Sequence, residues 1–500
     1  MLDLLISNFS IGFAAAFSPE NLLLCFVGAL LGTLIGVLPG IGSVATIAML
    51  LPITFGLPPT SAMIMLAGIY YGAHYGGSTT AILVNLPGEA SSVITCLDGY
   101  ALARAGRAGE ALALAAIGSF IAGCLTTFAI AFFGPALTVA TQWLGAPDYF
   151  ALMVLGLLAV IVLSRCSMLK ALIMLMAGFL LSMVGTDLIT AEPRMTFGIP
   201  ELSDGISFVA MSMGLFGISE IIANYAHGTD GEIITRKIER LLPSRKVMRQ
   251  ALPSMLRGTG IGMFLGMLPG GGGVLSSFCS YAVEKKFSKH PEQFGRGAVE
   301  GVAGPEAANN AGAQASFIPL LSLGIPSNAV MALMGGALLI QGITPGPHVI
   351  ATQPELFWGI VVSMWVGNVM LLVINLPLIG LWVKLLAVPY RVLAPMILVF
   401  CCIGAFSVHN SVFDVLLMMG FGVFGYLLMK LEYDPTPLLL AFILGPLIEE
   451  NLRRALQLSD GSPAVFIESP ISAVLLSLSA ILVIVALALD FRARRAAVAS

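Results

Sequence analysis

The sequence predicts an all-α polytopic membrane protein from three observations: few charges, long charge-free apolar runs and a duplicated glycine–proline motif. Of the 500 residues, 58% are apolar and only 10% are charged, whereas soluble domains carry about 25% charged residues. The apolar runs are continuous and do not alternate with polar residues, so a membrane β-barrel is not expected. The net charge of −3 gives no reason to expect a nucleic-acid partner.

The charge-free runs supply the membrane segments. No Asp, Glu, Lys or Arg occurs between Glu20 and Glu89, or between Glu306 and Glu355. A helix needs about 20 apolar residues to cross the hydrocarbon core, so the first run alone provides several crossings. Together with further apolar runs as far as 470–490, we expect about 11–13 spanning or partly spanning segments. Glu20, Glu89, Glu306 and Glu355 are used here only as the ends of these charge-free runs.

A glycine-rich motif occurs once in each half of the chain. Gly32-x-x-x-Gly36-x-Leu38-Pro39-Gly40-x-Gly42 recurs as Gly262-x-x-x-Gly266-x-Leu268-Pro269-Gly270-x-Gly272. A weaker pairing follows it, between Asn85-Leu86-Pro87-Gly88 and Gly324-Ile325-Pro326-Ser327. We infer an internal duplication. The predicted organisation is an N-terminal segment (1–20), a first membrane repeat (21–235), a basic linker (236–257), a second membrane repeat (258–469), and a last helix with a basic tail (470–500).

Loop charges predict that the two repeats cross the membrane in opposite directions. The linker is basic, and basic loops stay cytoplasmic, whereas residues 1–31 contain no Lys or Arg. Loop 284–296 is basic while its counterpart 55–60 is not, and 89–110 is basic while 343–355 is not. Inverted-topology repeats with broken helices build many secondary transporters.

The Pro-Gly pairs predict helix breaks inside the membrane, because Pro removes a backbone donor and Gly relaxes the backbone. A re-entrant hairpin would bury its tip in protein or in a cavity and present free amides to an anion. For Gly32 and Gly36 the alternative, close helix packing, is favoured. The residues expected to form the breaks are Leu38, Pro39, Gly40, Gly42, Pro87, Gly88, Leu268, Pro269, Gly270, Gly272 and Pro326.

A polar element follows each break. Buried hydroxyls and amides need partners, and a carboxylate substrate or a sodium ion near the same breaks would be such a partner. Ser327 and Asn328, just after Pro326, could instead begin a helix. The substrate-binding candidates are Ser78, Thr79, Thr80, Asn85, Asn310, Gln314, Ser327 and Asn328.

Other polar residues are weaker candidates. For His74 we favour a neutral, hydrogen-bonded histidine beside tyrosines over a proton site. The neighbouring tyrosines are Tyr70, Tyr71 and Tyr75. Asp187, Glu220, Asp414 and Glu449–Glu450 are expected at span ends. The sequence has neither a Gly-Lys-Ser/Thr phosphate loop nor the short motifs of metalloproteases and serine hydrolases, so no enzyme activity and no cofactor are expected.

Several motifs together resemble the large membrane subunit of the tripartite tricarboxylate transporters (TctA-type). They are Gly36–Gly42, Tyr71–Leu83 with Asn85–Gly88, and Gly266–Gly272 with Leu323–Pro326. The resemblance implies a multi-pass carrier of the bacterial inner membrane that takes up carboxylates such as citrate, driven by a sodium or proton gradient. It also implies two partners, a small four-span membrane subunit and a periplasmic solute-binding protein.

The main alternative is an ion or proton channel, or a conducting subunit of a larger membrane complex. A proton conductor is expected to carry Asp, Glu or His inside its spans. The scarcity of carboxylates within the apolar runs disfavours this alternative, and a membrane enzyme is least favoured.

Overall fold

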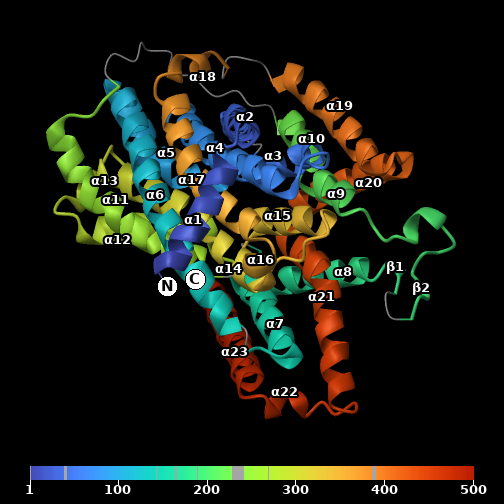
Figure 1. Cartoon of the computed structure of the whole chain (residues 1–500). Helices are drawn as coiled ribbons and strands as arrows, with labels where there is room; N and C mark the ends of the chain where they lie inside the picture. Colours follow the sequence, from blue (N-terminus) through green and yellow to red (C-terminus); the bar gives the residue numbers. More distant parts are fainter. Residues whose placement is uncertain are drawn as a thin grey trace.

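The computed structural model describes residues 2–38, 42–141, 143–163, 166–187, 190–227, 241–268, 270–385 and 390–499. Helices make up nearly all of this described part (Figure 1). Five helical stretches are long and apolar enough to cross a membrane, and six shorter apolar helices accompany them. The prediction of an all-α polytopic membrane protein is confirmed.

The first half runs from α1 to α10. Its elements are α1 (Leu2–Ala16), α2 (Pro19–Gly36), α3 (Gly42–Leu50), η1 (Leu51–Thr54), α4 (Pro59–Val84), η2 (Ala90–Ser92), α5 (Val93–Leu102), η3 (Ala103–Arg107), α6 (Ala108–Thr141), α7 (Ala146–Leu163), α8 (Met168–Ser182), β1 (Gly185–Thr186), β2 (Pro193–Arg194), η4 (Pro200–Leu202), α9 (Phe208–Ser212), η5 (Met213–Ile218) and α10 (Ser219–His227). The two short strands pair antiparallel, with Gly185 opposite Arg194.

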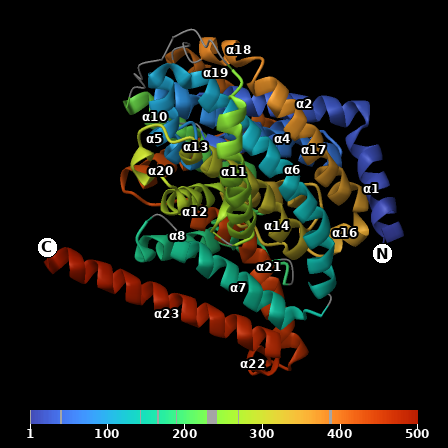
Figure 2. The same ribbon diagram turned by 90° about the vertical axis from the view of Figure 1, so that its left-hand side faces the viewer.

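The second half runs from α11 to α23. Its elements are α11 (Arg245–Gly266), α12 (Gly272–Phe287), η6 (Pro291–Gln293), α13 (Glu300–Ala315), α14 (Phe317–Leu323), α15 (Ala329–Ile340), α16 (His348–Thr352), α17 (Pro354–Asn375), α18 (Ile379–Leu385), α19 (Tyr390–His409), α20 (Val412–Lys430), α21 (Thr436–Leu458), α22 (Val465–Glu468) and α23 (Pro470–Ala499). Figure 2 shows α23 extending along α7 at the lower edge of the molecule.

Two helix units form the centre, one built from α2, α3 and α4 and the other from α11, α12 and α13. Within each unit the first and third helices pack against each other most extensively. Helices α6 and α17 contact α4 and each other, and α6 also packs on α13 and α11. The long helix α6 therefore joins the two units, as Figure 1 shows.

Glycines allow the close packing inside the first unit. Gly28, Gly32 and Gly36 recur every fourth residue along α2 and face the backbone of α4. A Cβ atom added at Gly32 would collide with the carbonyl oxygen of Ile69, and one at Gly36 with that of Ala73. Small residues at this spacing let two helix backbones approach closely.

The second unit repeats this contact. Gly258, Gly262 and Gly266 lie along α11, and a Cβ atom added at each would collide with a carbonyl oxygen of α13. The glycine pattern that the sequence repeats thus serves helix packing in both units, which is the alternative favoured above for Gly32 and Gly36.

Each unit contains a break at the glycine–proline motif. Helix α2 ends at Gly36 and α3 begins at Gly42, which has φ +67°; α11 ends at Gly266 and α12 begins at Gly272, which has φ +77°. Such positive φ angles favour glycine. Leu38 is buried and Leu268 is exposed, whereas Pro39, Gly40 and Pro269 lie outside the described residues.

Backbone hydrogen bonds tie each break to the polar element that follows it. The Gly42 amide donates to the Gly88 carbonyl at 3.2 Å, and the Gly270 amide donates to the Ser327 carbonyl at 2.7 Å. The weaker sequence pairing therefore corresponds to a repeated contact. Whether the two units have opposite orientations in a membrane stays a prediction, as do the boundaries of the two repeats.

Charged residues outside the two central units form ion pairs. Arg194 lies 2.8 Å from Glu449 and 3.4 Å from Asp187, and Arg453 lies 3.0 Å from Asp187. The hydrogen bond to Glu449 raises the pKa of the Arg194 guanidinium. His409 pairs with Asp414 at 2.6 Å. Of the linker 236–257, residues 236–240 lie outside the described part.

Candidate functional site

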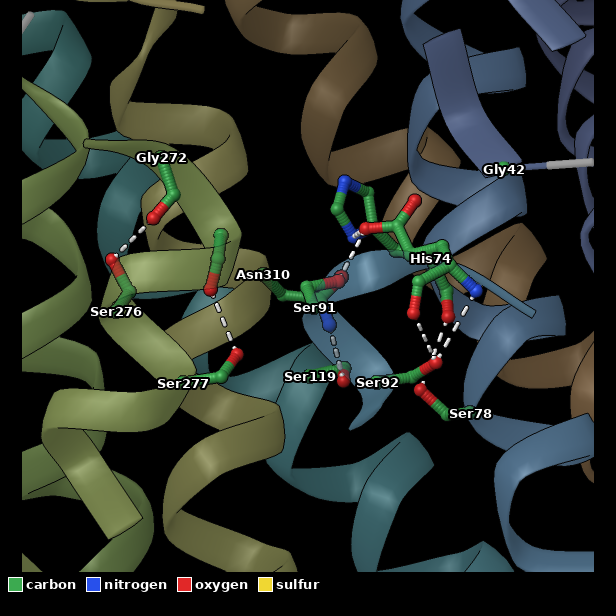
Figure 3. A network of polar contacts seen from close by, with 12 residues as sticks. Gly42, His74, Ser78, Ser91, Ser92, Ser119, Gly272, Ser276, Ser277 and Asn310 are labelled. Carbon is green, nitrogen blue, oxygen red and sulfur yellow. Dashed lines mark hydrogen bonds and ion pairs between the residues drawn. The ribbon is translucent and has the colours of Figure 1, made fainter. Parts of the chain in front are cut away.

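Helix α4 carries the polar centre of the first unit. Its residues from Ser61 to Val84 are buried, although the helix contains a histidine and several hydroxyl side chains. A buried polar group needs a hydrogen-bond or ionic partner, so the partners of these side chains define the site. Figure 3 shows the resulting network.

His74 is paired with a glutamate. Its Nδ1 atom lies 2.7 Å from Oε1 of Glu89, and the two side chains are only 2% and 6% exposed. The Tyr70 ring packs edge-on against the imidazole, with ring centres 4.7 Å apart. The sequence analysis placed His74 beside tyrosines, which holds for Tyr70, but it missed Glu89. Glu89 is therefore the polar partner of His74, and the tyrosine is a packing neighbour. Whether His74 is neutral stays a prediction.

Glu89 owes its position to the turn at Pro87 and Gly88. It caps η2, and its Oε1 atom accepts a hydrogen bond from Ser91. The Oε2 atom of Glu89 and the Nε2 atom of His74 are buried and have no hydrogen-bond partner within the described part of the chain.

The second buried carboxylate comes from the other unit. Glu306 of α13 is 1% exposed. Its Oε2 atom accepts a hydrogen bond from Ser78 at 2.6 Å, and its Oε1 atom accepts one from Thr95 of α5. Among the described residues, no Lys or Arg pairs with Glu89 or Glu306. Glu306 thus connects the polar centre of α4 to the second unit through hydroxyl groups alone.

A small cavity lies beside this contact. It has a volume of about 10 Å³ and is lined by Tyr75, Ser78, Thr79, Leu112, Ala115, Ala116, Ser119, Glu306 and Asn375. Asn310 donates a hydrogen bond to Ser119 at 2.6 Å next to it. A volume of this size holds about one water molecule, so the centre is closed to a carboxylate of the size of citrate in this conformation.

Further polar atoms gather where α12 begins. Asn309 is 1% exposed, and neither its amide nitrogen nor its amide oxygen has a described partner. A Cβ atom added at Gly273 would collide with Oδ1 of Asn309 and would lie 3.3 Å from the His74 ring. Buried Ser327 likewise has an unpartnered hydroxyl. The break of the second unit therefore faces the His74–Glu89 pair.

Five of the eight predicted substrate-binding residues lie at two places in the polar centre. Ser78, Thr79 and Asn310 lie at Glu306 and the adjoining cavity. Ser327 lies at the second break, and Asn328 beside it has its side-chain nitrogen 3.0 Å from where a Cβ atom of Gly272 would stand. Asn328 also accepts a hydrogen bond from the Met331 amide and so caps α15.

The remaining predicted residues have structural partners or lie at the surface. Thr80 donates to the Val37 carbonyl at 2.7 Å and holds α4 against the end of α2. Gln314 bonds to Thr127 and Asn368, on α6 and α17. Asn85 ends α4 with φ 58° and is exposed. Pro87 is half-buried, and Gly88 and Pro326 are buried.

The sequence analysis missed both buried carboxylates. Glu89 and Glu306 served there as the ends of charge-free runs and were not named as site residues. The argument from scarce carboxylates therefore did not count these two buried groups. Glu306, Asn309 and Asn310 follow at helical spacing among alanines and glycines. That i, i+3, i+4 pattern marks a polar stripe on one helix face and was the available signal. Thr95 and Ser119 carried no such signal.

The model of the tripartite tricarboxylate transporter TctA family matches residues 22–440. The "uncharacterized 52.8 kDa protein in TAR-I ttuC' 3'region" of Agrobacterium vitis is 56% identical over 495 residues, which cover 99% of this chain and 98% of that protein. The "uncharacterized protein in TAR-II ttuC' 3'region" of the same organism is 58% identical over 234 residues, which cover 47% of this chain and 97% of that protein. No solved structure matches the chain.

Proposed function

We propose a function from one premise: the chain belongs to the tripartite tricarboxylate transporter TctA family. It is a multi-pass membrane protein and a transporter component of such a system. We propose that it is the large subunit through which a carboxylate, citrate or a related organic acid, is taken up across the bacterial inner membrane by ion-coupled secondary transport. A small four-span membrane subunit and a periplasmic solute-binding protein are the proposed partners.

One observation carries this proposal: the polar contact of Ser78 with Glu306, which joins the two central units inside the protein. Inverted repeats place their helix breaks around one shared site, and unpartnered polar atoms of His74, Asn309 and Ser327 lie around this contact and the second break. Amide and hydroxyl donors of this kind bind a carboxylate. The substrate is therefore proposed to bind between α4 and α13 once the closed centre opens.

The buried carboxylates support coupling to a cation. A carboxylate substrate that binds near Glu89 and Glu306 is repelled by them unless positive charge accompanies it. A co-transported cation, sodium or a proton, removes this penalty. Ion coupling thus follows from the charge of the site, whichever carboxylate is the substrate.

Reconstitution in vesicles tests the function. The chain, the small subunit and a loaded binding protein are expected to accumulate labelled citrate, or another carboxylate from a panel of di- and tricarboxylates, against its gradient. Asn309→Ala is expected to reduce uptake about 10-fold or more, because a donor to a charged ligand contributes about 1.5–3 kcal/mol. Ser479→Ala in α23 is the control. The proposal fails if no carboxylate is accumulated under any ion gradient.

A second candidate function is favoured by the buried His74, Glu89 and Glu306, since intramembrane acids and histidines also occur in proton conductors. A channel or conducting subunit would pass protons or ions without any carboxylate. Vesicles that hold the chain and a pH indicator distinguish the two. A conductance independent of carboxylate supports the channel, and uphill accumulation of a carboxylate excludes it.

A further inference from the structure

We infer that His74, Glu89 and Glu306 form a proton-carrying site, and that Glu306 takes up one proton for each transport cycle. This inference rests on the proposed carboxylate uptake and specifies its coupling ion. It is argued from the charge balance of the buried groups and from the hydrogen-bonding partners of Glu306.

The charge balance of the site is unfavourable without an added proton. The site holds two carboxylates and one histidine, all buried. Even with His74 protonated, ionised Glu89 and Glu306 leave a net negative charge in the protein interior. Burying an uncompensated charge is costly, and such a group takes up a proton or a cation. One further proton makes the site neutral.

In the described part of the chain, no Lys or Arg of the surrounding helices pairs with Glu89 or Glu306. Helices α2, α6 and α17 carry one acidic residue each, in the first turn, and α3 and α15 carry none. Tyrosine and cysteine side chains are neutral near pH 7 at their ordinary pKa values, so Tyr70 and Tyr75 of α4 and Cys96 of α5 add no charge near Glu306 or the His74–Glu89 pair.

Two other buried carboxylates nearby are already satisfied. Glu284 of α12 pairs with Arg257 of α11, so this arginine is not available to Glu306. Asp98 of α5 accepts hydrogen bonds from Tyr281 and from the backbone amides of Gly295, Gly297 and Ala298, at 2.7–3.0 Å. The three amides all donate to Oδ1 of Asp98, and a backbone N–H can only donate, so these three partners cannot exchange roles with a proton on that oxygen.

Glu306 has partners of a different kind. Its hydrogen bonds come from the hydroxyls of Ser78 and Thr95. A hydroxyl can donate to a carboxylate and can equally rotate to accept from a carboxylic acid. The same geometry therefore serves the ionised and the protonated state of Glu306. Asp98 differs in having three backbone amides, which can only donate, among its partners, whereas both side-chain partners of Glu306 are hydroxyls. This contrast identifies Glu306 as the exchangeable site.

The position of Glu306 links this proton to the substrate. Glu306 lines the cavity that also includes Ser78 and Thr79, and Ser78 bonds in addition to the carbonyl of His74 one turn earlier. A substrate anion bound beside these groups favours the protonated site, and by linkage the proton favours substrate binding. The hydroxyl partners of Glu306 can donate to the carboxylate or accept from the carboxylic acid, which favours a proton over sodium as the coupling ion.

Vesicles containing the chain, the small subunit and citrate-loaded binding protein test the inference. A pH gradient, acidic outside and without sodium, is expected to drive citrate accumulation and to acidify an internal pH dye. Glu306→Gln is expected to reduce this gradient-driven accumulation about 10-fold or more and to abolish the dye signal. The same variant is expected to retain the exchange of external for internal citrate. Exchange needs no net proton movement, so this split separates loss of coupling from loss of folding.

Two further variants complete the test. Glu292→Gln, at an exposed carboxylate, is the matched control and is expected to behave as the unmodified chain. Thr95→Val removes a hydrogen bond that is stronger to the ionised than to the protonated form of Glu306. Protonation of Glu306 then becomes easier, so the pH of half-maximal uptake is expected to rise by about one unit. This second measurement decides the question if Glu306→Gln does not fold.

The opposite results would overturn the inference. Citrate accumulation that requires a sodium gradient and leaves the internal pH unchanged would assign the coupling to sodium while carboxylate uptake stands. Full pH-driven accumulation by Glu306→Gln, or an unchanged pH dependence of Thr95→Val, would remove Glu306 from the proton path. Absence of citrate accumulation under every gradient, with the carboxylate panel also inactive, would instead reject the proposed function itself.

Discussion

The two central units share a backbone arrangement and differ in chemistry. In α2–α4 and in α11–α13, three glycines at four-residue spacing face the carbonyls of the third helix, and a glycine with positive φ begins the second helix. The cap after each break differs: Glu89 begins η2, whereas neutral Asn328 begins α15. The first unit thus has a carboxylate group paired with a histidine at the position where the second has an amide.

The third helices differ as well. Helix α4 presents His74 and hydroxyl groups, whereas α13 presents Glu306, Asn309 and Asn310. The two sets are complementary, because Ser78 of one binds Glu306 of the other. The comparison shows that the packing glycines are duplicated, while the polar residues form one composite site to which each unit contributes different groups.

The largest expected effect concerns the orientation of the two units, which we predict to be opposite in the membrane. Labelling of single cysteines tests this orientation, and each site is expected to be either labelled or not labelled. Ser244, before α11, and Thr352, at the end of α16, are both exposed. A single cysteine can be introduced at each position. In a cysteine-free background an impermeant maleimide added to intact cells should label Thr352→Cys and not Ser244→Cys, since the basic linker faces the cytoplasm. Equal labelling of both would contradict the inverted arrangement.

Equal packing roles of the glycines predict equal losses of stability. Gly32→Ala and Gly262→Ala place a Cβ atom against a carbonyl oxygen, so each is expected to destabilise the protein by about 1–3 kcal/mol. Gly260→Ala, in the same helix as Gly262, meets no atom within 4 Å and is expected to be neutral or slightly stabilising. Thermal unfolding in detergent measures all three. A much smaller loss for one unit would show that its contact is not equivalent.

The asparagines at the two helix ends should give the smallest effects. Asn328→Ala removes the cap of α15 and the bond to Ser316 and is expected to cost about 1 kcal/mol of stability. Asn85→Gly should be neutral, because Asn85 is exposed in a left-handed conformation that glycine, found at Gly324, adopts freely. Uptake measured on both variants shows whether Asn328 also binds substrate. Strong loss of uptake by Asn85→Gly would require a binding role for Asn85 that its exposed position does not provide.

The sequence by itself determined the membrane class, the family and the helix breaks. Charge content and apolar run length are properties of each segment alone, and they fix whether that segment can lie in lipid. The glycine–proline motifs likewise act on the local backbone, so the ends of α2 and α11 fall where the motifs predicted. The polar neighbours of those breaks, including Ser78 and Asn310, were identified for the same reason.

Only the tertiary structure decided which polar groups meet. Ser78 and Glu306 are 228 residues apart in sequence, and Asp98 and Glu306 look alike as single acidic residues. Their difference lies in their partners, backbone amides for one and hydroxyls for the other, which come from distant segments. His74 lies against Glu89 because the turn at Pro87 and Gly88 returns Glu89 to α4. Long-range contacts depend on the packing of all the helices together, and no local pattern encodes them.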